Sequence, residues 1–365
     1  MGRERVLLVG ADYPDTPIDS FRRLLSPHYD VQVTDPFRTG GALGGFASLL
    51  PGPVERALIS SGANALKGDP MAFSWPKLRE ASQQFEPDIV FVTCIAELAP
   101  AMVAMFKKHK KAPKVLGFFA DAMVNFGRGP FFTAEYDAIF LKDPFVVNKL
   151  RKKLSWTHCF YLPEGCDPAI HHPVKLSDLD RERLGCDLTI AGNMHGFRAA
   201  ELAPLLGSNL KIWGTRPRSW FQHPIMRHHQ DRYVAAEEKC AAMLAAKIVL
   251  NPNHYGEIGG VNQRTFELAA MGAFQLTDAP GLADVFEPNV EVATFDSQTD
   301  MLKQIEYFLP RKSERLEIAA RARTRALAHH TFSHRWVAVL EAIGLAPPVD
   351  FPIQPSDLKV HARAS

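Results

Sequence analysis

The sequence of 365 residues lacks the signatures of several common classes of protein. No stretch approaches the roughly 20 apolar residues that a membrane-spanning helix needs, and the early run VLLVG is too short for a signal peptide. Neither G-x-G-x-x-G nor G-x-x-x-x-G-K-[ST] occurs, which disfavours dehydrogenases and P-loop NTPases. A net charge of +2 gives no reason to expect nucleic acid as a partner. We therefore expect a soluble, cytoplasmic protein.

Cysteine is scarce and irregularly placed. The five cysteines form no C-x-x-C pair, as expected for buried thiols in a reducing compartment and not for a disulfide scaffold or a zinc site. No histidine pair has the spacing of metal ligands on a helix beside a carboxylate. Asp178-Leu179-Asp180 has the form of a D-x-D metal motif, but it lies in a charged segment, and we interpret it as the start of a helix. We predict no metal and no cofactor.

Short apolar runs alternate with helical patterns along almost the whole chain. Such alternation predicts an α/β protein with parallel sheets that are covered by helices. The expected strands are Val6–Val9, Asp30–Val33, Ile89–Val92, Val115–Phe119, Ala138–Leu141, Cys159–Leu162, Leu188–Ala191, Leu210–Trp213, Ile248–Leu250, Phe274–Thr277 and Glu291–Thr294. The expected helices include Trp75–Phe85, Leu98–His109, Phe145–Leu154, Arg198–Leu206, Tyr233–Ala246, Val261–Met271, Met301–Phe308 and Glu314–Ala328.

The length suits two Rossmann-like domains that face each other across a cleft. A proline-rich and then charged segment between Leu162 and Leu188 suggests a junction, so we assign residues 1–170 to an N-terminal domain and 171–330 to a C-terminal one. Residues 331–365 would be an amphipathic helix followed by an extended, proline-rich tail. Basic clusters at 107–111 and 149–153 favour solvated helix faces, and weak peripheral contact with a membrane stays open.

The most informative stretch is NQRTFELAAMGAFQLTD, residues 262–278. Its helical run carries one carboxylate, Glu267, and is entered through Gly259 and Gly260. Glycines before a helix can free backbone N–H groups for a phosphate, and helical spacing places residue 263 on the face of Glu267. A lone glutamate is more often a solvated residue of an amphipathic helix. The flanking glycines and Arg264 nevertheless favour a nucleotide-sugar site, with Glu267 accepting hydrogen bonds from a ribose.

Polar residues follow most of the expected strands, and in parallel α/β sheets ligands bind beyond these carboxyl ends. The first half offers carboxylates there, whereas the second offers amides, glycines and arginines. This asymmetry suits a polyhydroxy acceptor on the first domain and an anionic donor on the second. A leaving diphosphate can be stabilised by cations and by neutral donors. We assign the cationic role to Arg198 and Arg264. The neutral donors we expect are Asn193, Gly214, Gly259, Gly260 and Asn262.

Several motifs in the same order resemble the spore-maturation CgeB-type glycosyltransferases, relatives of glycosyltransferase family 4. They are FLKDPFVVNKLRKK, YLPEGCDPAIHHP, LTIAGNMHGFR, the stretch at 262–278, PGLADVFEPNVEVATF and HTFSHR, and they cover roughly 115–336. The resemblance implies a GT-B fold. In this fold a C-terminal Rossmann-like domain holds the nucleotide-sugar, and a last helix, here 330–340, crosses back to the N-terminal domain.

The resemblance also implies transfer without a bound metal and with retention of the anomeric configuration. Family 4 enzymes usually carry two glutamates separated by seven residues, the first near the transferred sugar and the second at the ribose. Glu267 matches the second, whereas Gly259 occupies the first position. The donor would be a UDP-, GDP- or dTDP-sugar; the acceptor (glycan, protein or small molecule) and the oligomeric state stay open.

Two carboxylates of the first half are candidate catalytic groups. Asp121 ends one expected strand and Glu97 follows another, and either could orient or deprotonate an acceptor hydroxyl. A helix cap for Asp121 and a first-turn charge for Glu97 are equally good interpretations. A sugar-nucleotide epimerase or hydrolase on the same fold, and a non-catalytic nucleotide-sugar-binding protein, are the alternative functions.

Overall fold

The computed structural model describes residues 2–36, 54, 57–58, 61–62, 74–93, 98–126 and 129–357. The chain forms two compact units. The first contains the described residues up to Lys142, with Val146–Leu162 and Val337–Pro355. The second contains Asp143–Phe145 and Pro163–Trp336, so it begins earlier in the chain than the junction we placed after residue 170.

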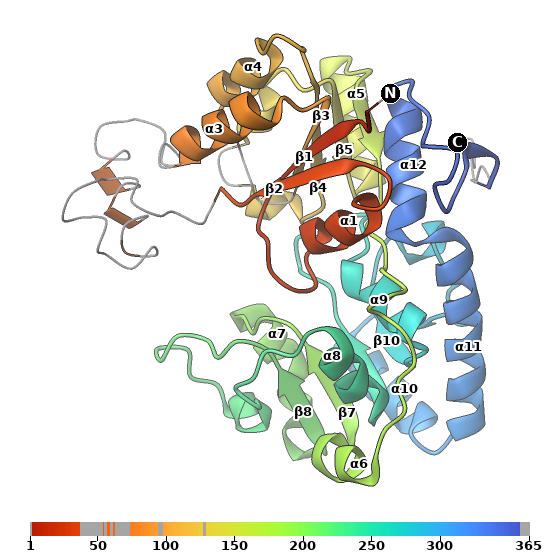
Figure 1. Cartoon of the computed structure of the whole chain (residues 1–365). Helices are drawn as coiled ribbons and strands as arrows, with labels where there is room; N and C mark the ends of the chain where they lie inside the picture. The colour runs from red at the N-terminus through yellow and green to blue at the C-terminus, as the bar shows by residue number, and fades with distance from the viewer. Residues whose placement is uncertain are drawn as a thin grey trace. The chain divides into compact units, whose positions relative to one another are not determined.

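The first unit is built on a six-stranded parallel sheet in the order β2-β1-β3-β4-β5-β6. Its strands are β1 (Arg5–Val9), β2 (Asp30–Thr34), β3 (Ile89–Thr93), β4 (Lys114–Phe119), β5 (Ala138–Leu141) and β6 (Cys159–Tyr161). Its helices are α1 (Pro17–Leu25), α3 (Trp75–Phe85), α4 (Pro100–Lys107) and α5 (Pro144–Leu154) (Figure 1). Both faces of the central strands are buried, which explains their continuous apolar runs.

The second unit is built on a five-stranded parallel sheet in the order β11-β10-β9-β7-β8. The strands are β7 (Cys186–Ala191), β8 (Leu210–Trp213), β9 (Ala246–Asn251), β10 (Gln275–Thr277) and β11 (Ala293–Thr294). The helices are α6 (Asp178–Leu184), α7 (Gly196–Leu202), α8 (Ala236–Leu244), α9 (Gln263–Met271), α10 (Gln298–Phe308) and α11 (Lys312–His329) (Figure 1). Helix α12 (Phe332–Ala342) begins in this unit and ends in the first.

The predicted alternation of strands and helices is confirmed, and every expected strand has its counterpart. Helix α6 does start at Asp178, because Ser177 and Asp180 form a reciprocal capping box. Helix α1 was missed, although Thr16 caps it and Pro17 occupies its first position. The tail beyond residue 345 packs on the first unit through Phe351, which is buried and lies against His28.

Of the predicted buried thiols, those of Cys159, Cys166, Cys186 and Cys240 are buried and belong to no disulfide among the described residues. Cys94 lies outside the described residues. Within the part of the chain that the structure describes, no helix combines the length and apolar character needed to cross a bilayer. The basic residues of α5 at positions 149 and 151–153 are exposed, and the contact with a membrane stays a prediction.

Candidate functional site

The two sheets share one topology, in which the strand order reverses beside the first strand of each unit. In the second unit this reversal lies between β7 and β9, which pair with each other. Ligands of doubly wound sheets bind outside the carboxyl ends of the strands at such a reversal. Here β7 runs into Gly192 and Asn193, and β9 ends at Asn251. We therefore expect a ligand site at this edge of the second sheet.

Two arginines, Arg198 and Arg264, converge on this edge, which is called the arginine edge below. A Cβ built on Gly192 would lie 2.8 Å from Nη2 of Arg264 and 3.2 Å from Nη1 of Arg198. The two nitrogens are therefore no more than about 6 Å apart, the sum of these two distances. Gly192 has a φ of +131°, a conformation that side chains rarely adopt, and the missing Cβ leaves room for both guanidinium groups.

Each arginine is held by oxygens of this same edge. Arg198, on α7, donates from Nη1 to the carbonyl oxygen of Asn193 over 2.5 Å, and its side chain is buried. Arg264, on α9, donates from Nη1 to Oδ1 of Asn251 over 3.0 Å. Among the residues that the structure describes, neither guanidinium forms an ion pair with a carboxylate. Nε of Arg198 is buried and has no hydrogen-bond partner among the residues described.

The electrostatics of the edge reflect this crowding of positive charge. Burial, and then the charge of Arg264, lower the pKa of Arg198 to about 9. Two carboxylates lie near enough to act on Arg198 through space. Burial, and then the charge of Asp278, raise the pKa of Glu201 to about 7. Burial also raises the pKa of Asp278. An anionic ligand would relieve the repulsion between the two arginines.

The amides beside the arginines satisfy one another. Asn262 donates from Nδ2 to Oδ1 of Asn251 and of Asn253, over 3.1 and 2.7 Å. Asn253 in turn donates to Thr277 and Asp278. This network fixes the ends of β9 and β10, so that the arginines stand on a rigid support.

Glu267 is not a solvated glutamate. All residues of α9 from Thr265 to Met271 are buried, and Glu267 is 3% exposed. Its Oε2 accepts from Nζ of Lys239 over 2.7 Å, and its Oε1 accepts from Nε2 of Gln263 over 2.8 Å. Nε2 of His171 lies 3.5 Å from Oε1. Burial alone would raise the pKa of Glu267, but Lys239 and then His171 hold it at about 2, so the carboxylate is charged.

The entry to α9 differs from our expectation. The helix begins at Gln263 and is capped by Asn262, whose Oδ1 accepts from the N–H of Thr265 over 3.1 Å. Gly259 and Gly260 precede the cap, and the N–H of Gly259 donates to Oδ2 of Asp143 over 3.0 Å. An asparagine, and not a glycine, therefore opens the helix, because its side chain satisfies an N–H group of the first turn.

The remaining predicted residues lie as follows. Asn193 is exposed beside Gly192, and the N–H of Gly214 donates to the carbonyl oxygen of Arg232 over 2.9 Å. Asp121 follows β4 in the first unit, where its Oδ1 accepts from the N–H of Ala122 over 2.7 Å and from Nδ2 of Asn125 over 3.0 Å. Glu97, like the glycines at 40–41 and 44–45, lies outside the described residues.

The partners of Glu267 could not be predicted from the sequence. Lys239 lies on α8 and His171 lies in the second unit ahead of α6, so both are remote from Glu267 in the chain. Lys239 follows Glu237 and Glu238 in α8, so the local sequence suggests a solvated helix start and not a partner for a buried carboxylate. Among the described residues, no group of three His, Cys, Asp or Glu side chains is arranged to hold a metal ion.

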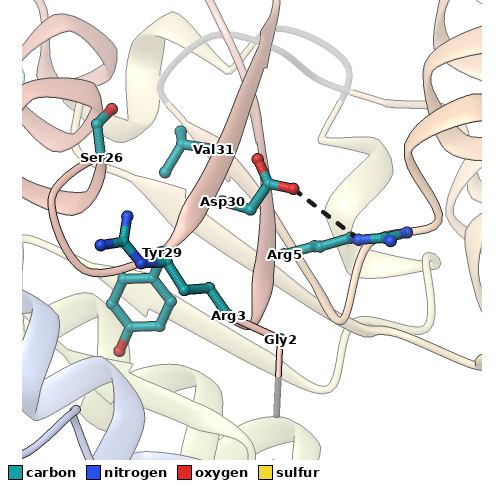
Figure 2. Close-up of a pocket in the computed structure, with 7 residues that line it drawn as sticks. All are labelled: Gly2, Arg3, Arg5, Ser26, Tyr29, Asp30 and Val31. Carbon is teal, nitrogen blue, oxygen red and sulfur yellow. Dashed lines mark ion pairs between the residues drawn. The ribbon is translucent and has the colours of Figure 1, made fainter.

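A separate pocket of about 540 Å³ lies in the first unit, at the amino ends of β1 and β2. Figure 2 shows its lining, in which Nε of Arg5 lies 3.9 Å from Oδ2 of Asp30. Because ligands of doubly wound sheets bind at the opposite, carboxyl ends of the strands, we do not assign the donor to this pocket.

Part of the chain matches a known family. Residues 196–341 match the model of a family described as glycosyl transferase-like. This range contains Arg198, Arg264 and Glu267. No curated protein matches the sequence.

Solved structures match almost the whole chain. Sucrose-phosphate synthase from Thermosynechococcus elongatus aligns with a TM-score of 0.63 and 11% identity, over 92% of this chain and 97% of its own. HepE from Anabaena, solved in complex with UDP, aligns with a TM-score of 0.62 and 10% identity, over 93% and 99%. A UDP-forming trehalose-phosphate synthase from Burkholderia xenovorans aligns with a TM-score of 0.55 and 11% identity, over 94% and 99%. These structures show that the chain has the GT-B fold, and residues 196–341 are similar to the glycosyl transferase-like family.

The expected fold class is thereby confirmed. The arginine edge belongs to the second unit, the half of the chain to which we assigned the donor. The finer resemblance to the CgeB-type enzymes and the cleft between the domains stay predictions.

Proposed function

We propose that this protein is a glycosyltransferase that moves a sugar from a nucleotide-sugar donor to an acceptor hydroxyl, and that Arg198 and Arg264 hold the donor's diphosphate. The observation that carries the proposal is the convergence of the two guanidinium groups on Gly192 without a carboxylate partner among the described residues. Two like charges so close together, one of them buried, are stabilised when a dianionic group lies between them.

The same arrangement suits the chemistry of transfer. As the glycosidic bond to the diphosphate breaks, negative charge grows on the leaving oxygen, and fixed cations stabilise that charge most when water is excluded. Arg198 is 7% exposed, and Asn193 and Asn251 hold the two guanidinium groups in place. The arginines would thus supply positive charge without a metal ion. The resemblance to family 4 favours retention at the anomeric carbon.

Glu267 is our candidate for the ribose. Its oxygens accept from Lys239 and Gln263, with His171 3.5 Å from Oε1, and a carboxylate can accept about four hydrogen bonds, so capacity remains for a ribose hydroxyl. Lys239 keeps the carboxylate charged, as a strong acceptor must be. Asn262 and Gly260 lie just before Arg264 in the chain, and we keep them as candidate neutral donors to the diphosphate. The N–H groups of Gly214 and Gly259 already donate to Arg232 and Asp143, so these glycines would serve the donor only by letting the backbone approach it closely.

Asp121 and Glu97 stay our candidates for orienting the acceptor. The Oδ1 of Asp121 already accepts from Ala122 and Asn125, as a local cap would. Its second oxygen would have to meet the acceptor hydroxyl. The comparisons give no acceptor. UDP is the first nucleoside diphosphate to test, because the Anabaena structure contains UDP and the Burkholderia enzyme is described as UDP-forming.

The proposal is tested by titrating the purified chain with UDP, GDP and dTDP in a calorimeter. We expect one of them to bind wild type, and Arg198→Gln and Arg264→Gln each to weaken binding roughly ten- to a hundredfold, since a hydrogen bond to a charged group is worth about 1.5–3 kcal/mol. Arg183→Gln is the matched control, because Arg183 is an exposed arginine of the same unit on α6. Unchanged affinity in both arginine variants would refute the assigned role.

Incubation with the corresponding nucleotide-sugars separates the alternative functions. Release of the nucleoside diphosphate or a changed sugar without any acceptor would favour the hydrolase or the epimerase. Saturable binding without turnover, with every acceptor tried, would favour a non-catalytic binding protein. We expect turnover that depends on an acceptor.

A further inference from the structure

Four rings stand together at the outer side of Arg198. His195 and Phe197 flank the start of α7, and His254 and Tyr255 follow β9. The ring centroids of His195 and His254 are 5.3 Å apart, those of His254 and Tyr255 4.2 Å, and those of Phe197 and Tyr255 5.5 Å. Phe197 is 48% exposed and Tyr255 63% exposed. These four rings, 195, 197, 254 and 255, are called the ring cluster below.

Both histidines of the ring cluster carry their N–H group on the same ring nitrogen, Nε2. The N–H of Arg198 donates to Nδ1 of His195 over 3.3 Å, and the N–H of Gly256 donates to Nδ1 of His254 over 3.1 Å. Because Nδ1 accepts in each ring, the proton of the neutral imidazole lies on Nε2. Burial, and then the charges of Arg198 and His254, lower the pKa of His195 to about 4, so its ring is neutral at physiological pH. The cluster thus combines two exposed aromatic rings with two N–H donors.

The position of the ring cluster follows from its neighbours. The N–H of Arg198 donates to Nδ1 of His195, so the ring cluster adjoins Arg198, whereas Glu267 lies one helical turn from Arg264 on α9. With the ribose at Glu267 and the diphosphate at the two arginines, the ring cluster adjoins the end of the diphosphate that Arg198 would hold. In a nucleotide-sugar, the group in that position is the transferred sugar.

We propose that the ring cluster binds the transferred sugar of the donor, with Phe197 and Tyr255 against a face of the sugar ring and Nε2 of His195 and His254 donating to its hydroxyls. The proposal rests on the donor site of the preceding section. The negative face of an aromatic ring attracts the polarised C–H groups of a pyranose, and neutral N–H donors match hydroxyl acceptors. The ring cluster would also supply contacts for the sugar in a chain that has Gly259 where family 4 enzymes usually have their first glutamate.

The test compares each nucleoside diphosphate with its own sugar conjugate: UDP with UDP-glucose, GDP with GDP-mannose, and dTDP with dTDP-glucose. Dissociation constants are measured by calorimetry for wild type, Phe197→Leu and Tyr255→Leu, which keep apolar bulk but remove the ring. For the pair that binds, we expect each variant to weaken the nucleotide-sugar about three- to tenfold more than the nucleoside diphosphate. Tyr255→Phe should restore the wild-type ratio.

His254→Phe keeps a ring and removes the N–H donor, and we expect it also to weaken the nucleotide-sugar selectively. Tyr307→Ala is the matched control, since Tyr307 is a 43% exposed tyrosine of the same unit on α10. Equal losses of affinity for the nucleoside diphosphate and its sugar conjugate would assign the rings to the nucleotide and overturn the proposal. Unchanged affinity for both would also overturn it and would leave the rings to the acceptor. If wild type bound none of UDP, GDP and dTDP, the donor site itself would be wrong.

Discussion

The buried ion pair beneath α9 makes a sharp prediction. In wild type, Nζ of Lys239 lies 2.7 Å from Oε2 of Glu267, which is 3% exposed. Replacing Lys239 by methionine keeps a long apolar side chain but leaves the carboxylate buried with its main partner removed. Breaking a buried pair from one side typically costs about 3–5 kcal/mol, because the remaining charge is uncompensated. We expect Lys239→Met to lower the free energy of unfolding at neutral pH by that amount.

The loss of stability in Lys239→Met should depend on pH through the charge of Glu267. The pKa of Glu267 is lowered from 4.5 to about 2, so ionisation stabilises the fold above pH 4.5, and this contribution, about 3 kcal/mol at 1.36 kcal/mol per pKa unit, is lost as the pH falls toward 2. In Lys239→Met the largest remaining influence is burial, which raises the pKa. Acidification then protonates the carboxyl group of Glu267, so the variant no longer holds an uncompensated buried charge. The difference between wild type and variant should therefore shrink as the pH falls.

Hydrogen exchange of the α9 amides is a suitable assay, because two units need not unfold in one step and a local probe follows the affected helix. We would compare wild type with Lys239→Met at about pH 7.5 and about pH 5 under denaturant. Adding Glu267→Gln to Lys239→Met removes the unpaired charge and should recover part of the loss. A loss that is independent of pH, or a double variant less stable than Lys239→Met, would refute this reasoning.

Three further predictions concern single positions. Gly192→Ala should weaken binding of the nucleoside diphosphate at least about tenfold by calorimetry, because its Cβ would lie 2.8 Å from Nη2 of Arg264; unchanged affinity would contradict the arrangement of the arginines. Glu201→Gln should be up to about 3 kcal/mol more stable than wild type at pH 8 and equal at pH 4 in thermal unfolding, because the raised pKa of about 7 makes ionisation unfavourable in the fold; a difference independent of pH would contradict this. Thr16→Ala should cost about 1 kcal/mol in urea unfolding, because Oγ1 of Thr16 accepts from the N–H of Asp19 over 3.2 Å; an unchanged midpoint would contradict the cap.

Much of the fold could be predicted because the strands of parallel sheets are short, apolar on both faces and separated by helical patterns. Ile89–Thr93 and Leu210–Trp213 are clear examples, and their bounds in the structure agree with the sequence prediction to within a residue. Helix ends were harder, since they depend on side-chain caps. The pattern over 233–246 was read as one helix, whereas α8 spans Ala236–Leu244 and Ala246 already belongs to β9.

The site was predictable in part. Arg198 and Arg264 stand out beside strand ends and glycines, and the structure brings them together at Gly192. The environment of Glu267 was not predictable from its neighbours in the sequence. Whether a helix is covered on one side or all round depends on tertiary packing, here on α11, whose Arg323 donates to the carbonyl oxygen of Ala270 over 3.2 Å.

The arrangement of charges explains why a buried carboxylate can serve an anion site. If Glu267 stood alone beneath the arginines, its charge would cancel that of Arg264 and repel a diphosphate. Lys239 pairs with Glu267 at 2.7 Å and neutralises it, so that the positive charge of Arg264 and Arg198 remains for a ligand. The carboxylate nevertheless stays ionised and can accept from hydroxyl groups. A donor with hydroxyls on one side of its diphosphate and a sugar on the other matches this order of charges, whereas a simple phosphate would use only the middle of it.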